Sequence, residues 1–223
     1  MPPSALPLAT SSLVDALYAA LRTRIINGDI AQGEKVTENR IATEYDVARP
    51  TAKACLERLI MVGLLDRPAH KTAVVPTLRE QDVQDIFFTR DLVETSAVAL
   101  LAGRGPTPSS VRRTQDAMEI AARTGAFPDQ VAADIDFHSS LVSETGSHRL
   151  TRMHQLILGE VQMTMGLYSA HRTAPALSVA TEHAEIIRAI DDQNSELAVR
   201  RMREHLDAAR ARILTRMQET DDA

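Results

Sequence analysis

The chain has 223 residues, of which 44% are hydrophobic and only 3% aromatic, and its formal net charge is −5. This length suits one large domain or two ordinary ones, and the acidic balance argues against broad, nonspecific binding to nucleic acid. The sequence has no apolar run of about 18 residues and no apolar stretch behind a basic N-terminal segment, so we expect neither a membrane span nor a signal peptide.

The residue types and the distribution of charge narrow the class of protein further. Cys55 is the one cysteine, so no intrachain disulfide can form, as is usual in the cytoplasm. A core made of Leu, Ile, Val, Ala and Met favours helices. Residues 1–78 hold nine Lys or Arg and eight Asp or Glu, whereas the remainder is acidic. This distribution is compatible with DNA binding through a small local patch on the N-terminal part.

Two helices are predicted after the first ten residues, which are rich in Pro, Ala and Ser and expected to be disordered. Ser11 or Ser12 can cap the first helix, whose Leu and Ile side chains recur at helical spacing as far as Ile25. Thr37 can cap the second, which is short. Asp46 follows at a tight turn, where Asp tolerates the left-handed conformation better than most residues.

A third helix, expected over residues 47–63, has two different faces. One face carries four apolar residues at core spacing, Ala52, Leu56, Leu59 and Ile60. The opposite face carries Arg49 and Lys53, which are four residues apart and therefore stacked on one side. Two cations near the start of a short buried helix are typical of the helix that a helix-turn-helix protein inserts into the major groove. On spacing alone, a solvated basic face remains the alternative.

A hairpin is expected directly after this helix. Two strand-like runs, residues 64–67 and 72–75, flank a tip that contains His70 and Lys71. Three helices followed by a hairpin make a winged helix-turn-helix, which we place in residues 11–76. His70 and Lys71 at the wing tip could reach the neighbouring minor groove.

Three motifs in this N-terminal part carry a family resemblance. They are G-D-I-A-Q-G after the first helix, R-I-A in the second and G-L-L at the start of the hairpin. With them, about residues 13–75 resemble the DNA-binding domain of GntR-type bacterial transcription regulators. The resemblance makes Arg49 the base reader and Lys53 its partner, and we add Thr51, which lies between them, as a further DNA contact.

The chain departs from the GntR pattern at four places. Ala48 stands where a Ser cap is usual, Ala54 stands where a Glu is common, and the wing carries His and Lys where the family has a glycine. Lys53 replaces a second arginine, and Lys cannot make the planar bidentate pair that Arg makes with guanine. The fold prediction is unaffected, but the bases that are read stay open.

The rest of the chain, residues 79–218, is predicted to be a bundle of about six antiparallel helices. Gly and Pro residues separate amphipathic segments, and no segment has the pattern of a strand. The expected helices are residues 80–103, 109–124, 129–144, 148–171, 176–191 and 195–218. The fold class is therefore mainly α, with a winged head and a helical body.

Four residues of the body could ligate a metal ion. Asp134 and His138 stand at i and i+4 on one face of the third body helix, and His183 and His205 lie on the fifth and sixth. One carboxylate and three imidazoles could hold a divalent ion. On spacing alone this indication is weak, because most of the seven histidines are expected to be ordinary residues. Asp136 is a rival carboxylate, but it faces away from His138.

Three stretches around these residues carry a second resemblance. They are D-I-D-F-H-S-S-L, T-E-H-A-E-I-I-R-A-I and R-M-R-E-H-L. Together they resemble the FCD ligand-binding domain of FadR-type GntR regulators over about residues 79–215. The resemblance implies Asp134, His138, His183 and His205 as ligands of zinc, nickel or manganese, beneath a pocket for a small carboxylate.

Two further residues are candidates for binding that carboxylate. Arg90, in R-D-L-V-E on the first body helix, could pair with it, although a role at the surface or in a dimer is as plausible. Ser147, in T-G-S-H-R-L, stands where the family commonly has Asn, so one pocket contact differs.

Together these features predict a cytoplasmic transcription regulator, a repressor that acts as a homodimer. Each head would bind one half of a near-palindromic double-stranded operator, and the body would sense a small organic acid through the metal-anchored pocket. One alternative is a metal-responsive regulator, in which the ion itself is the signal. Another is a metal-dependent hydrolase, since three His and one Asp could activate water, but the head argues against it.

Overall fold

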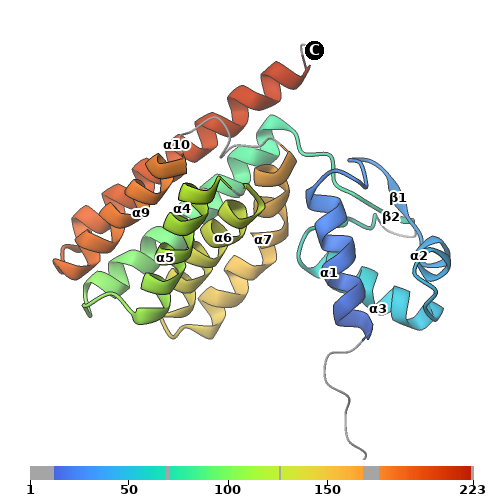
Figure 1. Cartoon of the computed structure of the whole chain (residues 1–223), viewed down its shortest axis with the longest axis horizontal. Coiled ribbons are helices and arrows are strands. Elements are labelled where there is room, and N and C mark those ends of the chain that lie inside the picture. Colours follow the sequence, from blue (N-terminus) through green and yellow to red (C-terminus); the bar gives the residue numbers. More distant parts are fainter. Residues whose placement is uncertain (1–12, 69–70, 126, 168–175, 222–223) are drawn as a thin grey trace, which may run out of the picture. The chain divides into compact units, whose positions relative to one another are not determined.

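The computed structural model describes residues 13–68, 71–125, 127–167 and 176–221 (Figure 1). The chain divides into two compact units, Met1–Pro76 and Thr77–Ala223. The fold is mainly helical, as predicted. No helix in these ranges is both long enough and apolar enough to traverse a lipid bilayer.

Three helices form most of the N-terminal unit: α1 (Leu13–Ile26), α2 (Glu38–Glu44) and α3 (Arg49–Met61). The Thr37 hydroxyl accepts a hydrogen bond from the backbone N of Arg40 at 3.1 Å and so caps α2, as the sequence predicted. Asp46 lies between α2 and α3 with φ at 50°, in the left-handed region. The apolar faces meet in one core made of Leu17, Leu21, Ile25, Ile41, Ala52, Leu56 and Leu59.

The wing differs from the predicted hairpin. β2 (Ala73–Val74) pairs antiparallel with β1 (Lys35–Val36), whereas the expected first strand, residues 64–67, contributes a single bridge between Asp66 and Val74. The backbone N atoms of Leu64 and Leu65 donate instead to the carbonyl oxygen of Leu59, in the last turn of α3. Those amides are therefore not available to a ladder, and both side chains are buried consecutively in the core.

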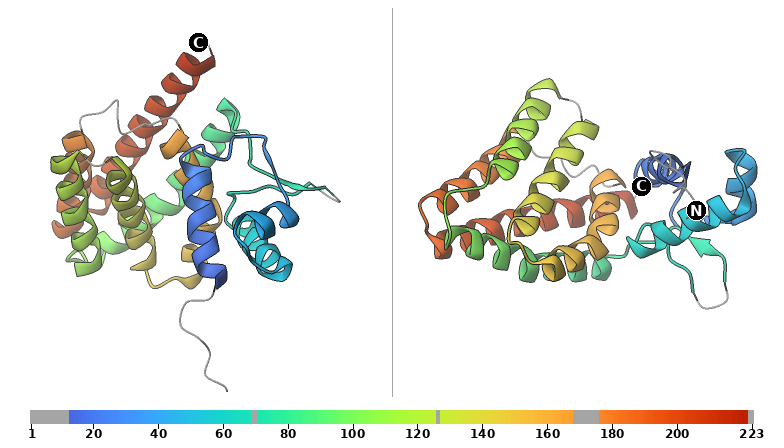
Figure 2. Two further views of the ribbon diagram at one scale, coloured as in Figure 1. Left: turned by 45° about the vertical axis from the view of Figure 1, so that its right-hand side comes forward. Right: turned by 90° about the horizontal axis from the view of Figure 1, so that it is seen from below.

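Six described helices form the C-terminal unit: α4 (Glu80–Ala102), α5 (Ser109–Thr124), α6 (Phe127–Ser143), α7 (His148–Leu167), α9 (Ala176–Asp191) and α10 (Ser195–Asp221). Figures 1 and 2 both show α10 running along α4. The direction is antiparallel, because Ser195 meets the carbonyl of Ala99 while Arg203 pairs with Asp91. These helices present side chains toward the bundle interior, where the candidate metal ligands lie.

Candidate functional site

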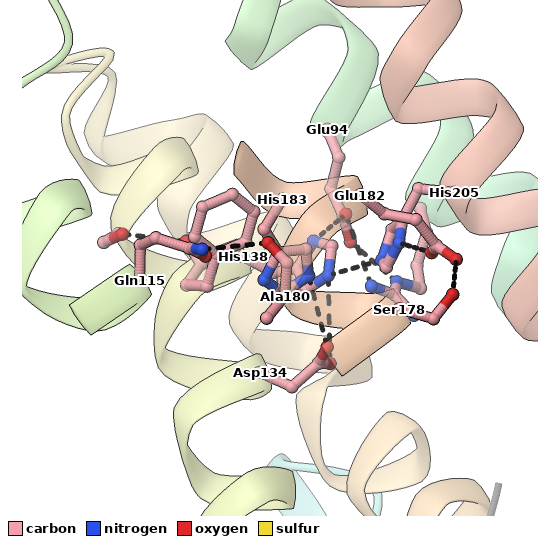
Figure 3. Close-up of polar contacts among 12 residues, drawn as sticks. Glu94, Gln115, Asp134, His138, Ser178, Ala180, Glu182, His183 and His205 are labelled. Atoms are coloured by element: carbon pink, nitrogen blue, oxygen red, sulfur yellow. Dashed lines mark hydrogen bonds and ion pairs between the residues drawn. The ribbon is translucent and has the colours of Figure 1, made fainter. Parts of the chain in front are cut away.

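The four predicted metal ligands lie together inside the helical bundle. Asp134 and His138 come from α6, His183 from α9 and His205 from α10, and all four are buried. One potential ligand atom of each lies within 4.8 Å of the others (Figure 3). Ligand atoms bound about 2.1 Å from one ion are at most about 4.2 Å apart, so a small inward movement would suit them to a shared ion.

The position of the ligands on α6 follows from helical geometry. Asp134 and His138, one turn apart, both face inward, whereas the rival Asp136 is exposed. Phe137 is fully buried next to them, and its ring stacks on the ring of His183 with centroids 3.9 Å apart and planes 9° from parallel. The stack therefore fixes the orientation of one imidazole.

Two carboxylates outside the predicted set face the histidines. Nδ1 of His138 lies 2.6 Å from a carboxylate oxygen of Glu94 on α4, and Nδ1 of His205 lies 2.7 Å from Glu182 on α9. The His138 contact is not well aligned as a hydrogen bond. At 2.6 Å, however, the nitrogen and the oxygen must share a proton, because two lone pairs so close would repel each other.

Burial sets the charge of the groups in this cluster. Loss of solvent lowers the pKa of His183 to about 3 and also lowers the pKa of His205, so both imidazoles are neutral near pH 7. Burial alone would raise the pKa of Glu94, but the positive charge of Arg90 together with the contacts to His138 and His154 outweighs it and holds that pKa well below the usual range. Neutral imidazoles and ionised carboxylates are the forms that ligate and orient a metal ion.

The residues present fit a divalent metal ion. Neither ring nitrogen of His183 has a hydrogen-bond partner among the described residues, although its Nε2 lies 3.3 Å from Oδ1 of Asp134. A buried polar atom without a hydrogen bond costs free energy, and an ion between the imidazole and the carboxylate would satisfy it. Three nitrogen ligands and one oxygen ligand match zinc, nickel or manganese better than the all-oxygen shells of calcium and magnesium.

The two predicted effector contacts lie in different surroundings. Arg90 is fully buried beside the cluster, and its Nε donates to Glu94 at 2.7 Å. The exposed Ser147 accepts a hydrogen bond from the backbone N of Leu150 at 3.3 Å, which caps α7. No contact between Ser147 and the four ligands is recorded within the described ranges.

Sequence reasoning missed the two carboxylates and one histidine. It gave Glu94 no site role, did not consider Glu182, and treated His154 as an ordinary residue. His154 is buried, with Nε2 3.4 Å from Glu94. Glu182 precedes His183 in the chain but contacts His205 on another helix, so no spacing rule could have found it.

The candidate nucleic-acid interface lies on the N-terminal unit. Arg49 begins α3 with 67% of its side chain exposed, and its only recorded ion pair within the described ranges joins it to Glu38 at 3.5 Å. Lys53 is exposed one turn later, and Thr51 is half-buried. His70 lies outside the described residues.

A cleft of about 400 Å³ adjoins the start of α3. Three cations line it, Arg49, Arg67 and Lys71. Arg67 also forms an ion pair with Glu57 and was not singled out in the sequence. The cleft thus brings the start of the helix and the wing to one basic surface.

Each of the two units matches a known protein family. Residues 85–208 match the FCD domain, and residues 13–75 match the bacterial regulatory proteins of the gntR family. The chain belongs to the GntR family. It is therefore a DNA-binding transcription regulator of the type that carries an FCD domain, and since GntR proteins are regulators, the hydrolase alternative finds no support in the family.

Individual GntR proteins match over most of their length. BphR, an HTH-type transcriptional regulator of Paraburkholderia xenovorans, is 23% identical over 215 residues, covering 92% of this chain and 87% of the relative. The gluconate operon transcriptional repressor of Bacillus licheniformis is 22% identical, covering 86% of this chain and 82% of the repressor. These alignments span both units.

Solved structures of GntR proteins share the fold. A transcriptional regulator GntR from Rhodococcus sp. RHA1 superposes with a TM-score of 0.77 at 25% identity, covering 92% of this chain and 99% of that one. E. coli McbR/YncC gives a TM-score of 0.72 at 17% identity, covering 95% and 100%.

Proposed function

We propose that this GntR-family regulator is a cytoplasmic repressor whose operator binding is controlled by a small organic acid bound beside a divalent metal ion. The observation that carries the proposal is the buried convergence of Asp134, His138, His183 and His205 from three helices. Burying a carboxylate is costly unless its charge is compensated, and a divalent ion would compensate it.

The same ion would anchor the effector. Four protein ligands leave one or two coordination positions open if the ion is five- or six-coordinate, and a carboxylate can take such a position. Arg90 supports this assignment, because its Nη1 is buried and has no hydrogen-bond partner among the residues described. A second oxygen of the acid could accept a hydrogen bond from this atom. Ser147 is kept in the proposal as a contact for a part of the acid farther from the metal.

On the N-terminal unit, Arg49, Thr51 and Lys53 of α3 would enter the major groove, while Lys71 of the wing would lie beside it. A single small head offers few contacts, so tight binding requires two heads on a symmetric operator and hence a homodimer. The gluconate operon relative is named a repressor, which supports the sign of regulation proposed here.

Helix α4 could carry the signal out of the body. It begins at Glu80, shortly after the end of the N-terminal unit at Pro76, and Glu94 on the same helix contacts His138. A movement of His138 on effector binding would therefore act on α4. Effector binding would favour the arrangement of heads that no longer matches both half-sites, which is a shift between existing populations.

A ligand screen tests the proposal. Small organic acids would be added to metal-loaded protein, and any acid that raises the melting temperature would be tested for release of operator DNA. The proposal expects a hit that requires the metal and that fails with His183→Ala. Release of DNA on adding metal alone, with no effect of any acid, would favour the metal-responsive alternative.

A further inference from the structure

His138 and His205 share one arrangement that His183 lacks. Each points Nδ1 at a carboxylate, Glu94 at 2.6 Å and Glu182 at 2.7 Å, and the two Nε2 atoms then face each other at 3.2 Å. The carboxylates therefore contact the nitrogen of each ring that does not face the other histidine, and Figure 3 draws these contacts.

The positions of the protons follow from these contacts. An ionised carboxylate only accepts hydrogen bonds, so the Nδ1 atoms of both rings must carry the proton. In a neutral imidazole the other nitrogen, Nε2, then has a lone pair and no proton. Two lone pairs that face each other at 3.2 Å repel unless a cation lies between them. The carboxylates thus prepare the two rings for a cation.

We infer that Glu94 and Glu182 are positioning residues of the metal centre, which hold His138 and His205 in the tautomer whose Nε2 binds the ion. The inference rests on the metal site of the proposed function and adds its outer carboxylates. Such partners of ligating histidines raise ligand basicity and fix ring orientation. His183 provides the contrast, because its Nδ1 has no hydrogen-bond partner among the described residues and its ring is held by the stack on Phe137.

The two carboxylates differ in how safely they can be replaced. Glu94 is fully buried and also pairs with Arg90 and His154, so its loss would leave a buried guanidinium without its partner. Glu182 is 27% exposed, and its further contacts are Ser178 at 3.4 Å and Arg212 at 3.8 Å. Glu182 is therefore the better position for a test.

The experiment compares Glu182→Leu with Glu182→Gln and with Glu185→Leu. Leu has a similar size but no acceptor, whereas Gln keeps one acceptor oxygen. Glu185 is the matched control, because it lies on the same helix and pairs with Arg201 at the surface. Zinc affinity would be measured by competition with a chromophoric chelator, and the tautomer of His205 by 15N NMR of the metal-free protein. Glu94→Gln would be measured alongside.

We expect zinc binding to weaken about 10- to 100-fold in Glu182→Leu, the size of effect that loss of such a partner usually has. The NMR spectrum should show a proton on Nε2 of His205 in this variant and on Nδ1 in the wild type, and Glu182→Gln should lose less affinity. Affinity of Glu182→Leu equal to that of Glu185→Leu, or an unchanged tautomer, would overturn the inference while leaving the metal site intact. A wild-type chain that binds no zinc would reject the metal site and the inference together.

Discussion

Nε2 of His138 on α6 lies 3.2 Å from Nε2 of His205 on α10, although the two residues are 67 positions apart in the chain. His183 on α9 completes the group, and its ring centroid is 4.8 Å from that of His205. Three helices are thus joined at one point by their imidazole side chains. A metal ion at this point would stabilise the folded body, because the unfolded chain does not present these ligands together.

Removing one imidazole should release the metal. We expect purified wild-type protein to contain about one divalent ion per chain, and His205→Ala to contain much less, since removing any one ligand lowers affinity strongly. Elemental analysis of protein never exposed to chelator measures both. Operator binding should largely survive in His205→Ala, because the head has its own core.

The matched control for this experiment is His148→Ala. His148 lies at the start of α7 and is exposed, whereas the four candidate ligands are buried. Its metal content should equal that of the wild type. Equal content in His205→Ala, or no metal in the wild type, would count against the site, and the histidines would then be packed helix residues only.

The convergence of the four candidate metal ligands could be predicted because two of them lie one turn apart on a single helix and the others lie in recognisable family motifs. Glu94 and Glu182 could not be predicted in the same way. Each contacts a histidine on a different helix, and the pairing depends on how the helices pack rather than on any spacing within one of them. Arg90 was predicted either to pair with the effector or to act at the surface or in a dimer; its burial does not fit a surface role, and its pairing with Glu94 was not foreseen for the same reason.

The helices of the fold were predicted well, and their local details less so. Apolar periodicity gave the body helices to within a few residues at most of their described ends. The last helix was expected to begin at residue 195, and the structure places the cap at Asn194, whose side chain accepts a hydrogen bond from the backbone N of Leu197 at 2.9 Å. β1 escaped notice because two residues are too short to show alternation, and its partner β2 is distant in sequence.

A homodimer should form in solution through the body. Phe88 and Leu92 lie one turn apart on α4 with more than half of each side chain exposed, and Met153 and Leu156 are similarly exposed on α7, which packs against α4. Apolar residues grouped in this way often mark interfaces.

Light scattering should give a dimer for the wild type and a monomer for the Phe88→Glu, Leu92→Glu double variant. Ile120→Glu on α5, equally exposed, is the control that should stay dimeric. A wild-type monomer at micromolar concentration would contradict the prediction.

Acid should weaken the body through Asp191. Burial raises the pKa of Asp191, but hydrogen bonds from Thr107, at 2.9 Å, and from Arg112, at 2.7 Å, outweigh it and hold the pKa below its ordinary value. A depressed folded-state pKa gives stability that is present above the unfolded pKa of about 3.9 and is lost as pH falls through the folded value.

The corresponding experiment compares Asp191→Asn with wild type by urea unfolding between pH 3 and pH 7, with chelator present so that metal binding does not contribute. At pH 7 the variant should be about 1 kcal/mol less stable, because it weakens one charge-assisted pair. This deficit should shrink as the wild-type carboxylate becomes protonated. Asp192→Asn, at the exposed neighbouring position, should show no such dependence. A deficit that is constant with pH would contradict the assignment.

Arg49 should decide recognition of the operator. The ion pair with Glu38 is long at 3.5 Å and largely exposed, so releasing Arg49 to a base costs little. We expect Arg49→Ala to weaken binding to a selected operator by about 1–3 kcal/mol, because a base-edge contact is lost. Lys53→Ala should weaken binding less and lower the salt slope by about one unit if Lys53 meets a phosphate.

Gel-shift titrations at two salt concentrations separate these effects, with Arg113→Ala on the exposed face of α5 as the control. Unchanged affinity and unchanged sequence preference in Arg49→Ala would show that another element of the head reads the DNA, and the cations Arg67 and Lys71 of the neighbouring cleft would be the next to replace.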